Sequence, residues 1–309
     1  MESKVGTVPR LNIIGCGRVG RALGRVWLRH GLVELGGILN RSLASSQAAA
    51  LFLGAGMPVE DYRHLPPAEL VMISTADEAI GSCAAAWAAS HPQATGVLVF
   101  HCSGALGLEV LEPARLVGAW IASVHPVKSF ADPAAAADSF PGTWCGLEGQ
   151  PEATARLQQM LEACGAKTFL IPPNQKPLYH AGAVFACNYL VALMKVAFDC
   201  LAQAGVSAHD APALLRPIVE ETVRNVFRLG PVRALTGPIA RGEPSVVQRE
   251  LAALDTWQPA YGQLYRSLGQ VALQLAQSAG HAPPEALRHI ASLLSSGPLA
   301  SPQTQPAPV

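Results

Sequence analysis

The sequence predicts a doubly wound α/β domain followed by an all-helical domain. A glycine-rich turn joins a strand pattern to a helix pattern near the N-terminus, and short apolar runs then alternate with helical patterns as far as Ile171. Beyond the proline-rich stretch 172–177 the sequence holds no convincing strand pattern. We therefore expect a sheet domain over residues 1–172, a helical domain over 173–295 and a disordered tail over 296–309, which is rich in Ser, Pro, Ala and Gln.

The first predicted strand is the apolar run 11–14, which ends in a Gly-x-Gly-x-x-Gly turn, and an amphipathic helix pattern follows at once. Gly15 permits the turn, Gly17 lets the backbone approach a pyrophosphate, and Gly20 lets the helix pack on the strand. The unpaired N–H groups at the start of a helix attract phosphate. The motif predicts a dinucleotide site whose contacts are Gly15, Cys16, Gly17, Arg18, Val19 and Gly20.

The second predicted strand, 33–39, ends at Asn40, Arg41 and Ser42. A site for NAD usually has Asp or Glu here, which binds the 2′-hydroxyl of the ribose. The carboxylate is missing and an arginine stands in its place, and guanidinium groups suit phosphate oxygens. An ordinary polar turn with a solvated arginine is the alternative. The pattern favours NADP over NAD, with Asn40, Arg41 and Ser42 beside the 2′-phosphate.

The later strands are predicted from buried apolar runs, and the helices between them from helical periodicity. Strands are expected at 70–74, 96–101, 117–123, 143–148 and 167–171, and helical segments at 80–90, 108–111 and 152–164. In the second domain we expect five helices. The second of them is capped by Ser207 or Asp210, runs to residue 229 and bends at Pro217, and the third is capped by Ser245. The other four span 177–204, 246–254, 259–279 and 284–294.

Small polar groups follow three of these strands, at the sheet edge where ligands of open α/β sheets bind. Their sequences are Ser74-Thr75-Ala76-Asp77, His101-Cys102-Ser103-Gly104 and Ser123-Val124-His125-Pro126. An Asp or Ser after a single strand is more often a helix cap, but three in succession favour a site. We expect Ser74, Thr75 and Ala76 to contact the cofactor, and Ser103 and His125 to contact the substrate.

The helical domain adds three candidates. At about 100° per residue, His180 and Asn188 are roughly 80° apart on one helix and can face one cleft. Arg241, in the loop 235–242, can clamp a carboxylate or phosphate. The alternatives are a histidine hydrogen-bonded near a helix end and a surface arginine.

Composition argues against several kinds of partner, metal site and location. Lys+Arg and Asp+Glu are both 22 and no basic run is present, which argues against a nucleic-acid partner. The seven cysteines hold no C-x-x-C pair, which favours reduced thiols over disulfides or a zinc site, so no metal is expected. The N-terminus lacks the apolar region of a signal peptide. The apolar run 181–194 is shorter than a membrane span, so we expect a soluble, cytoplasmic protein without a membrane partner.

These motifs make the chain recognisable. The glycine motif, His101-x-Ser103-Gly104, His125-Pro126, the stretch 179–189 and the stretch 235–242 resemble a family of uncharacterised oxidoreductase-like proteins. Its members have a Rossmann-like N-terminal domain and a helical domain of unknown function, number 2520. The resemblance implies NADP binding and a distant relationship to pyrroline-5-carboxylate reductase, ketopantoate reductase and deazaflavin-dependent NADP reductase. Those relatives imply a dimer with intertwined helical domains. The ketopantoate branch uses a helix lysine as proton donor, in a region that His180 occupies here.

The expected function is the NADP-dependent reduction of a C=O or C=N bond in a small, anionic metabolite. His180 is the expected proton donor, Asn188 and Ser103 orient the substrate, and Arg241 or His125 pairs with its anion. The alternative is a non-catalytic NADP(H)-binding regulator whose helical domain meets a protein partner. The uniformly apolar helix 181–194 predicts a homodimer through the helical domain.

Overall fold

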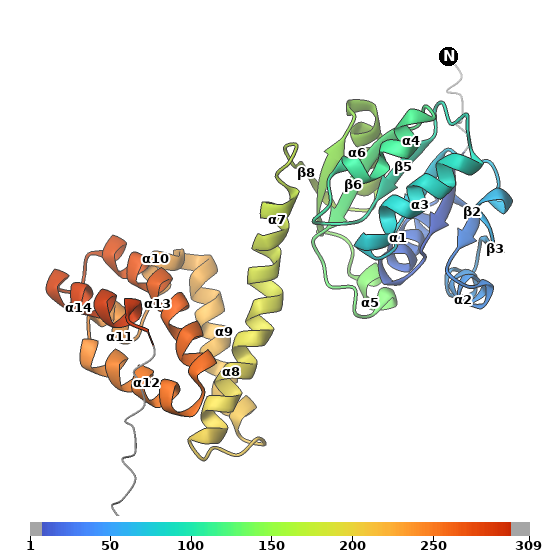
Figure 1. Cartoon of the computed structure of the whole chain (residues 1–309). Helices are drawn as coiled ribbons and strands as arrows, with labels where there is room; N and C mark the ends of the chain where they lie inside the picture. Colours follow the sequence, from blue (N-terminus) through green and yellow to red (C-terminus); the bar gives the residue numbers. More distant parts are fainter. Residues whose placement is uncertain (1–7, 298–309) are drawn as a thin grey trace, which may run out of the picture. The chain divides into compact units, whose positions relative to one another are not determined.

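The computed structural model describes residues 8–297, and the chain divides into two compact units, one ending at Tyr189 and the other beginning at Leu190 (Figure 1). The first holds the sheet and the second is helical. The domain limit at residue 172 stays a prediction, since α7 (Lys176–Ala183) clusters with the sheet. Most of the tail expected to be disordered lies outside the described residues.

The first unit is built on an eight-stranded sheet, within the described residues, with the order β3-β2-β1-β4-β5-β6-β7-β8. Neighbouring strands are parallel except β6 and β7. The strand order reverses between β1 and β4, and ligands of such sheets bind at that point. The strands are β1 (Arg10–Ile14), β2 (Glu34–Leu39), β3 (Met57–Val59), β4 (Leu70–Ile73), β5 (Leu98–His101), β6 (Trp120–Pro126), β7 (Trp144–Gly149) and β8 (Lys167–Leu170).

Helices cover both faces of the sheet, as the continuous apolar strands require. One buried cluster joins Leu11 and Met72 to Trp27 of α1 and Leu157 of α6. The other joins Ile73 and its neighbours to α3 and α4. The expected doubly wound α/β class is confirmed. The helices of the first unit are α1 (Arg18–Arg29), α2 (Leu43–Leu53), α3 (Asp77–Ser90), α4 (Glu112–Leu116), α5 (Pro133–Asp138), α6 (Pro151–Ala163) and α7, and 3₁₀ turns form at Tyr62–His64 and Leu108–Leu111.

Helices α2 and α5 and strand β3 were not predicted from the sequence. Both helices carry start signals, because the side chains of Ser42 and Asp132 accept hydrogen bonds from N–H groups in the following turn. Helix α2 ends at Gly54, which has a φ of +70°. Strand β3 has three residues, too few to show a periodic pattern.

The long helices of the second unit follow in the predicted order, but two short helices, Pro231–Ala234 and Pro238–Arg241, were not predicted, and the second of them lies in the expected loop 235–242. The unit contains α8 (Tyr189–Gln203), α9 (Ala211–Leu229), α10 (Pro231–Ala234), α11 (Pro238–Arg241), α12 (Pro244–Trp257), α13 (Pro259–Ala279) and α14 (Pro284–Ser295). The cap predicted at Ser245 is wrong, because α12 begins one residue earlier, at Pro244. Pro217 lies inside α9. Of the two caps proposed for α9, Asp210 occupies the position before the helix but its side chain makes no cap bond, and the Ser207 hydroxyl accepts a hydrogen bond from the Asp210 N–H at 3.1 Å.

The apolar helix runs without a break from Lys176 to Gln203, through α7, the π-helical turn Val184–Asn188 and α8. It is 28 residues long, and by length and composition alone it could cross a membrane. The prediction that the segment is too short for a span is therefore wrong, because the helix extends beyond the apolar run 181–194. No part of its most apolar stretch is buried within this chain.

Candidate functional site

The glycine motif forms a tight loop between β1 and α1. Gly15 has a φ of +79°, and a Cβ there would lie 2.8 Å from the Thr75 nitrogen. At Gly20 a Cβ would lie 2.5 Å from Ser74 Oγ and 3.4 Å from Ile13 Cγ2, so the glycine lets α1 pack closely on β1 and on the residue that follows β4. At Gly17 the nearest atom would be 3.9 Å away, which leaves that part of the backbone open. Gly15 and Gly20 therefore have the turn and packing roles that the motif predicts, and the approach of a pyrophosphate at Gly17 stays a prediction.

The start of α1 offers free donors. The first helical hydrogen bond runs from the Arg21 N–H to the Gly17 carbonyl, at 3.0 Å. The N–H groups of Arg18, Val19 and Gly20 precede it and have no acceptor in the helix. The first turn contains no acidic residue. This arrangement fits an anionic group such as a pyrophosphate.

The three residues after β2 divide between structural and free roles. The Asn40 side chain accepts the Cys16 N–H at 2.6 Å, which ties the glycine loop to the end of β2. The Ser42 side chain caps α2 through the Ser45 N–H. Arg41 is exposed, and within the described residues its side chain has no hydrogen bond or ion pair. Arg41 is thus the residue of the three that remains free to bind a phosphate.

Cys16 and the end of β4 support the same loop. The Cys16 side chain is buried, and burial raises the pKa of its thiol to about 12, so the thiol stays neutral. Ser74 Oγ donates to the Gly15 carbonyl at 2.9 Å. Thr75 is half-buried, and Ala76 occupies the position before α3. Of the predicted cofactor residues after β4, Ser74 and Thr75 therefore lie directly beside the loop.

A cavity of about 190 Å³ lies at the carboxyl edge of the strands in the first unit. It brings together residues from all three predicted strand exits, Val19 of the glycine motif and His180 of α7. Its lining includes the predicted residues Val19, Ser74, Thr75, Ser103, His125 and His180. The cavity therefore borders the glycine loop.

His125 and His180 face each other across Gly104. Their ring centroids are 5.8 Å apart, and a Cβ on Gly104 would lie 2.5 Å from His180 Cδ2 and 2.7 Å from His125 Nε2. His125 Nδ1 is hydrogen-bonded to the Tyr179 hydroxyl at 2.7 Å. Burial, followed by the charges of Lys176 and His180, lowers the His125 pKa to about 4. His125 is therefore a neutral hydrogen-bonding group at physiological pH.

Ser103 organises the turn after β5. Its hydroxyl donates to Asp77 Oδ2 at 2.8 Å and accepts from the N–H groups of Ala105 and Leu106. The buried His101 accepts the Ser103 N–H at Nδ1 and bonds the Gly107 carbonyl through Nε2. Burial, with the charge of Lys176, lowers the His101 pKa to about 3. His101 and the Ser103 hydroxyl thus hold the shape of the turn.

The sequence analysis missed Lys176. Its side chain is 1% exposed, and Nζ donates to the Ser103 carbonyl at 2.5 Å and to Ser123 Oγ at 2.8 Å. Burial lowers its pKa to about 8. The sequence offers one signal, a single lysine in the first turn before an apolar helix, but an exposed lysine would give the same pattern.

Two of the five predicted substrate residues do not line the cavity. Asn188 is exposed and closes the π-helical turn, so the angle calculated for a regular α-helix does not apply to its spacing from His180. Arg241 belongs to the second unit, where it is exposed and makes a two-pronged ion pair with Glu243, at 2.8 and 2.9 Å. The roles of both residues stay predictions.

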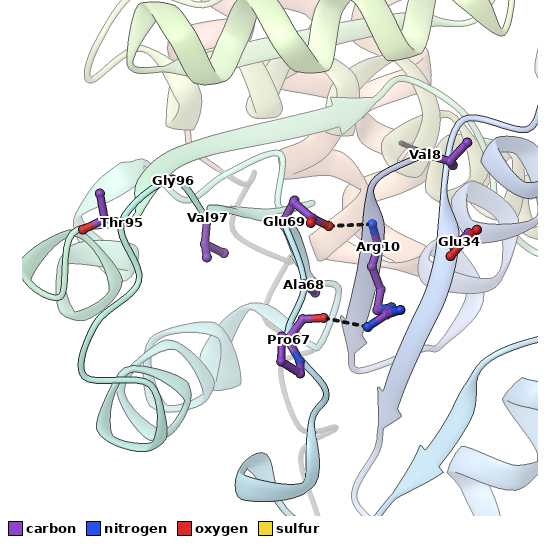
Figure 2. A pocket seen from close by; sticks show the side chains of 9 residues that line it. All are labelled: Val8, Arg10, Glu34, Pro67, Ala68, Glu69, Thr95, Gly96 and Val97. Carbon is purple, nitrogen blue, oxygen red and sulfur yellow. Dashed lines mark hydrogen bonds between the residues drawn. The ribbon is translucent and has the colours of Figure 1, made fainter. Parts of the chain in front are cut away.

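A larger cavity of about 650 Å³ lies at the opposite, amino edge of the strands (Figure 2). Arg10 and Glu69 meet in its wall, where the Arg10 N–H donates to Glu69 Oε2 at 2.8 Å and the guanidinium donates to the Pro67 carbonyl. Its lining contains neither the glycine loop nor the histidines. The smaller cavity is therefore the candidate site.

Comparisons with known proteins agree with this architecture. A Rossmann-like domain model matches residues 4–126, and the model of the domain of unknown function 2520 matches residues 143–294. No curated protein sequence matches the chain.

Several solved structures share the fold. A Bacteroides fragilis protein classed as an NADP oxidoreductase has a TM-score of 0.67 at 21% identity, over 88% of this chain and 98% of its own. Protein TM1727 from Thermotoga maritima has a TM-score of 0.66 at 26% identity, over 87% and 98%. Pyrroline carboxylate reductase from Plasmodium falciparum, solved with NADP bound, has a TM-score of 0.54 at 14% identity, over 93% and 98%.

Proposed function

We propose that this chain, which matches a Rossmann-like domain model over residues 4–126 and the model of the domain of unknown function 2520 over residues 143–294, is an NADP-dependent oxidoreductase. Its reaction is the reduction of a C=O or C=N bond in a small, anionic metabolite. One observation carries the proposal: the cavity shares Val19, Ser74 and Thr75 with the surroundings of the glycine loop. A substrate in that cavity is next to whatever the loop binds.

The cofactor residues follow from the loop. The amides of Arg18, Val19 and Gly20 receive the pyrophosphate, and Arg41 pairs with the 2′-phosphate. Asn40 holds the loop through Cys16, and Ser74 holds it through Gly15. When bound, the nicotinamide supplies the hydride.

The substrate residues follow from the cavity. Hydride transfer to a C=O or C=N bond leaves charge on the heteroatom, and His180 donates the proton that neutralises it. His125 is held neutral and donates or accepts a hydrogen bond at Nε2, beside Gly104. Lys128 also lines the cavity, and its ammonium donates one hydrogen bond to the Ser139 carbonyl, at 2.9 Å. Lys128 thus gives the lining a cation, and the one acid in the lining, Asp77, already accepts a hydrogen bond from Ser103, which favours an anionic substrate.

The experiment is a screen of NADPH oxidation against small keto acids, imines and cyclic imino acids, with wild type and His180→Ala. The variant should lose about 10²- to 10⁴-fold in rate and keep its affinity for NADPH. His64→Ala is the matched control, because His64 is exposed and lies outside the cavity lining. Tight NADPH binding without turnover of any compound would favour the alternative, an NADP(H)-binding regulator.

We also propose that the protein is a cytoplasmic homodimer, and the apolar helix Lys176–Gln203 supports the dimer. Phe185 is 66% exposed and Val191 is 72% exposed on the apolar helix, and such surface is normally covered. A second copy is a better cover than a lipid bilayer, because Lys195 and Asp199 form an ion pair on this helix. Light scattering should give about twice 32.3 kDa at micromolar concentration, and a monomer mass would contradict the dimer.

A further inference from the structure

A row of buried polar side chains crosses the sheet behind the candidate site. His101, Ser123 and Glu148 are neighbours in register on β5, β6 and β7, so their side chains share one face of the sheet. All three are less than a tenth exposed. Such a row needs partners, because buried polar groups without hydrogen bonds are costly.

Lys176 reaches this row from α7. Its ammonium joins two elements, since one acceptor, the Ser103 carbonyl, lies on the turn after β5 and the other, Ser123 Oγ, lies on β6. The side chain is buried and does not line the cavity. It therefore has no direct access to a molecule bound there.

We propose that Lys176 is a positioning residue, which clamps the turn 102–107 to β6 and so fixes the place of Gly104 between His125 and His180. The inference rests on the proposed function only in taking the cavity as the substrate site. A hydrophobic residue would be less costly to bury than an ammonium, so the lysine is best explained by the two bonds it makes.

The turn depends on the clamp at its centre. Ser103 provides the carbonyl that Lys176 binds, and its hydroxyl holds the N–H groups of Ala105 and Leu106 at 3.1 and 3.0 Å. Gly104 follows directly, with no room for a Cβ beside the two histidines. A small shift of Ser103 would therefore move Gly104 relative to the two histidine rings that line the cavity.

Lys176 is electrostatically coupled to the charged groups around it and to His125. Glu148, Cys102, Asp77 and Glu109 favour its ammonium form, and burial opposes it. Glu148 Oε2 has no hydrogen-bond partner among the described residues. On β6, His125 is two residues beyond Ser123 and on the same face, so it lies about 7 Å along the strand from the clamp. The groups that act on His125 are Lys176, His180 and Asp77, with Tyr179 hydrogen-bonded to its ring.

The test uses the full chain without ligand and two readouts from NMR: amide exchange at Ala105 and Leu106, and the titration of the His125 ring. In Lys176→Met/Glu148→Gln, which leaves no unpaired buried charge, both amides should exchange about ten- to hundredfold faster, as expected for the loss of a charge-assisted bond. His125 should titrate at higher pH, toward its ordinary value of 6.5. Lys176→Gln, which keeps a donor without the charge, should restore part of the amide protection and leave the His125 titration raised.

Lys167→Met is the matched control, because Lys167 is an exposed lysine of the same unit that lies over the ring of Trp144. If the double variant does not fold, Lys176→Gln carries the test. Amide exchange and His125 titration in a folded variant that match those of Lys167→Met would overturn the proposal. Failure of wild type to bind NADPH would contradict the proposed function and leave these two readouts unaffected.

Discussion

Replacing Gly15 by alanine tests whether the loop after β1 is a built binding site. Gly15 has a φ of +79°, in the left-handed region, where a side chain costs about 1–2 kcal/mol. The new Cβ would also lie 2.8 and 2.9 Å from the backbone N and Cα of Thr75, which cannot rotate away. Such overpacking adds about 1–3 kcal/mol. The free energy of unfolding of the first unit should therefore fall by about 2–5 kcal/mol in Gly15→Ala.

Gly31→Ala separates the two causes. Gly31 has a φ of +64°, and a Cβ there would meet nothing within 4 Å. It should lose only the conformational part, about 1–2 kcal/mol. The difference between the two variants then measures the contact with Thr75.

The assay is urea unfolding followed by tryptophan fluorescence, because four of the five tryptophans lie before Tyr189 and report on the first unit. An NADPH titration accompanies it. Displacement of the loop should weaken NADPH binding in Gly15→Ala at least about tenfold, a change of 1.4 kcal/mol, while Gly31→Ala binds as wild type does. Equal stability losses in the two variants would refute the packing argument, and unchanged NADPH affinity in Gly15→Ala would refute the placement of the cofactor.

Three further predictions use other parts of the site. Arg41→Ala should bind NADPH about ten- to hundredfold more weakly than wild type and should keep the wild-type affinity for NADH. Equal affinity of wild type for the two cofactors would contradict the assignment of NADP. Gly104→Ala should lose turnover in the NADPH oxidation screen and keep its affinity for NADPH, because its Cβ fills the space beside His125 Nε2. Undiminished turnover would place the substrate elsewhere. Burial lowers the Lys176 pKa to about 8 from 10.5, so between these values the unfolded chain binds more protons and the contribution of Lys176 to stability rises with pH. The stability of wild type minus that of Lys176→Met should therefore increase from pH 8 to pH 10.5 in urea titrations, and a constant difference would show that Lys176 is not buried as a charge.

Local chemistry made the first half of the fold predictable. Continuous apolar runs alternating with helix patterns predict a two-sided sheet, and the glycine spacing places a tight turn between β1 and α1. The three polar strand exits were predicted to share an edge, and the cavity lining confirms that they do. These features depend on periodicity and on backbone conformation, and both are set by residues that are close together in the sequence.

What the sequence could not supply is the environment of single side chains. Lys176 looks like any lysine near a helix start, and it is buried only because α7 places it against β6. Ser103 was proposed as a substrate contact, but its hydroxyl donates to Asp77, which is 26 residues away in the sequence. The angle between His180 and Asn188 was calculated for a regular helix, and the π-helical turn that alters it has no sequence signal here.

The sequence by itself therefore determined the class of fold, the order of most strands and long helices, and the glycine turn between β1 and α1, because each follows from the pattern of a few adjacent residues. The tertiary structure alone decided which polar groups are free and which are used. That difference has one physical reason: a hydrogen bond such as the one between Lys176 and Ser103 joins residues 73 positions apart, and the cost or gain of burying a charge exists only once both are in place.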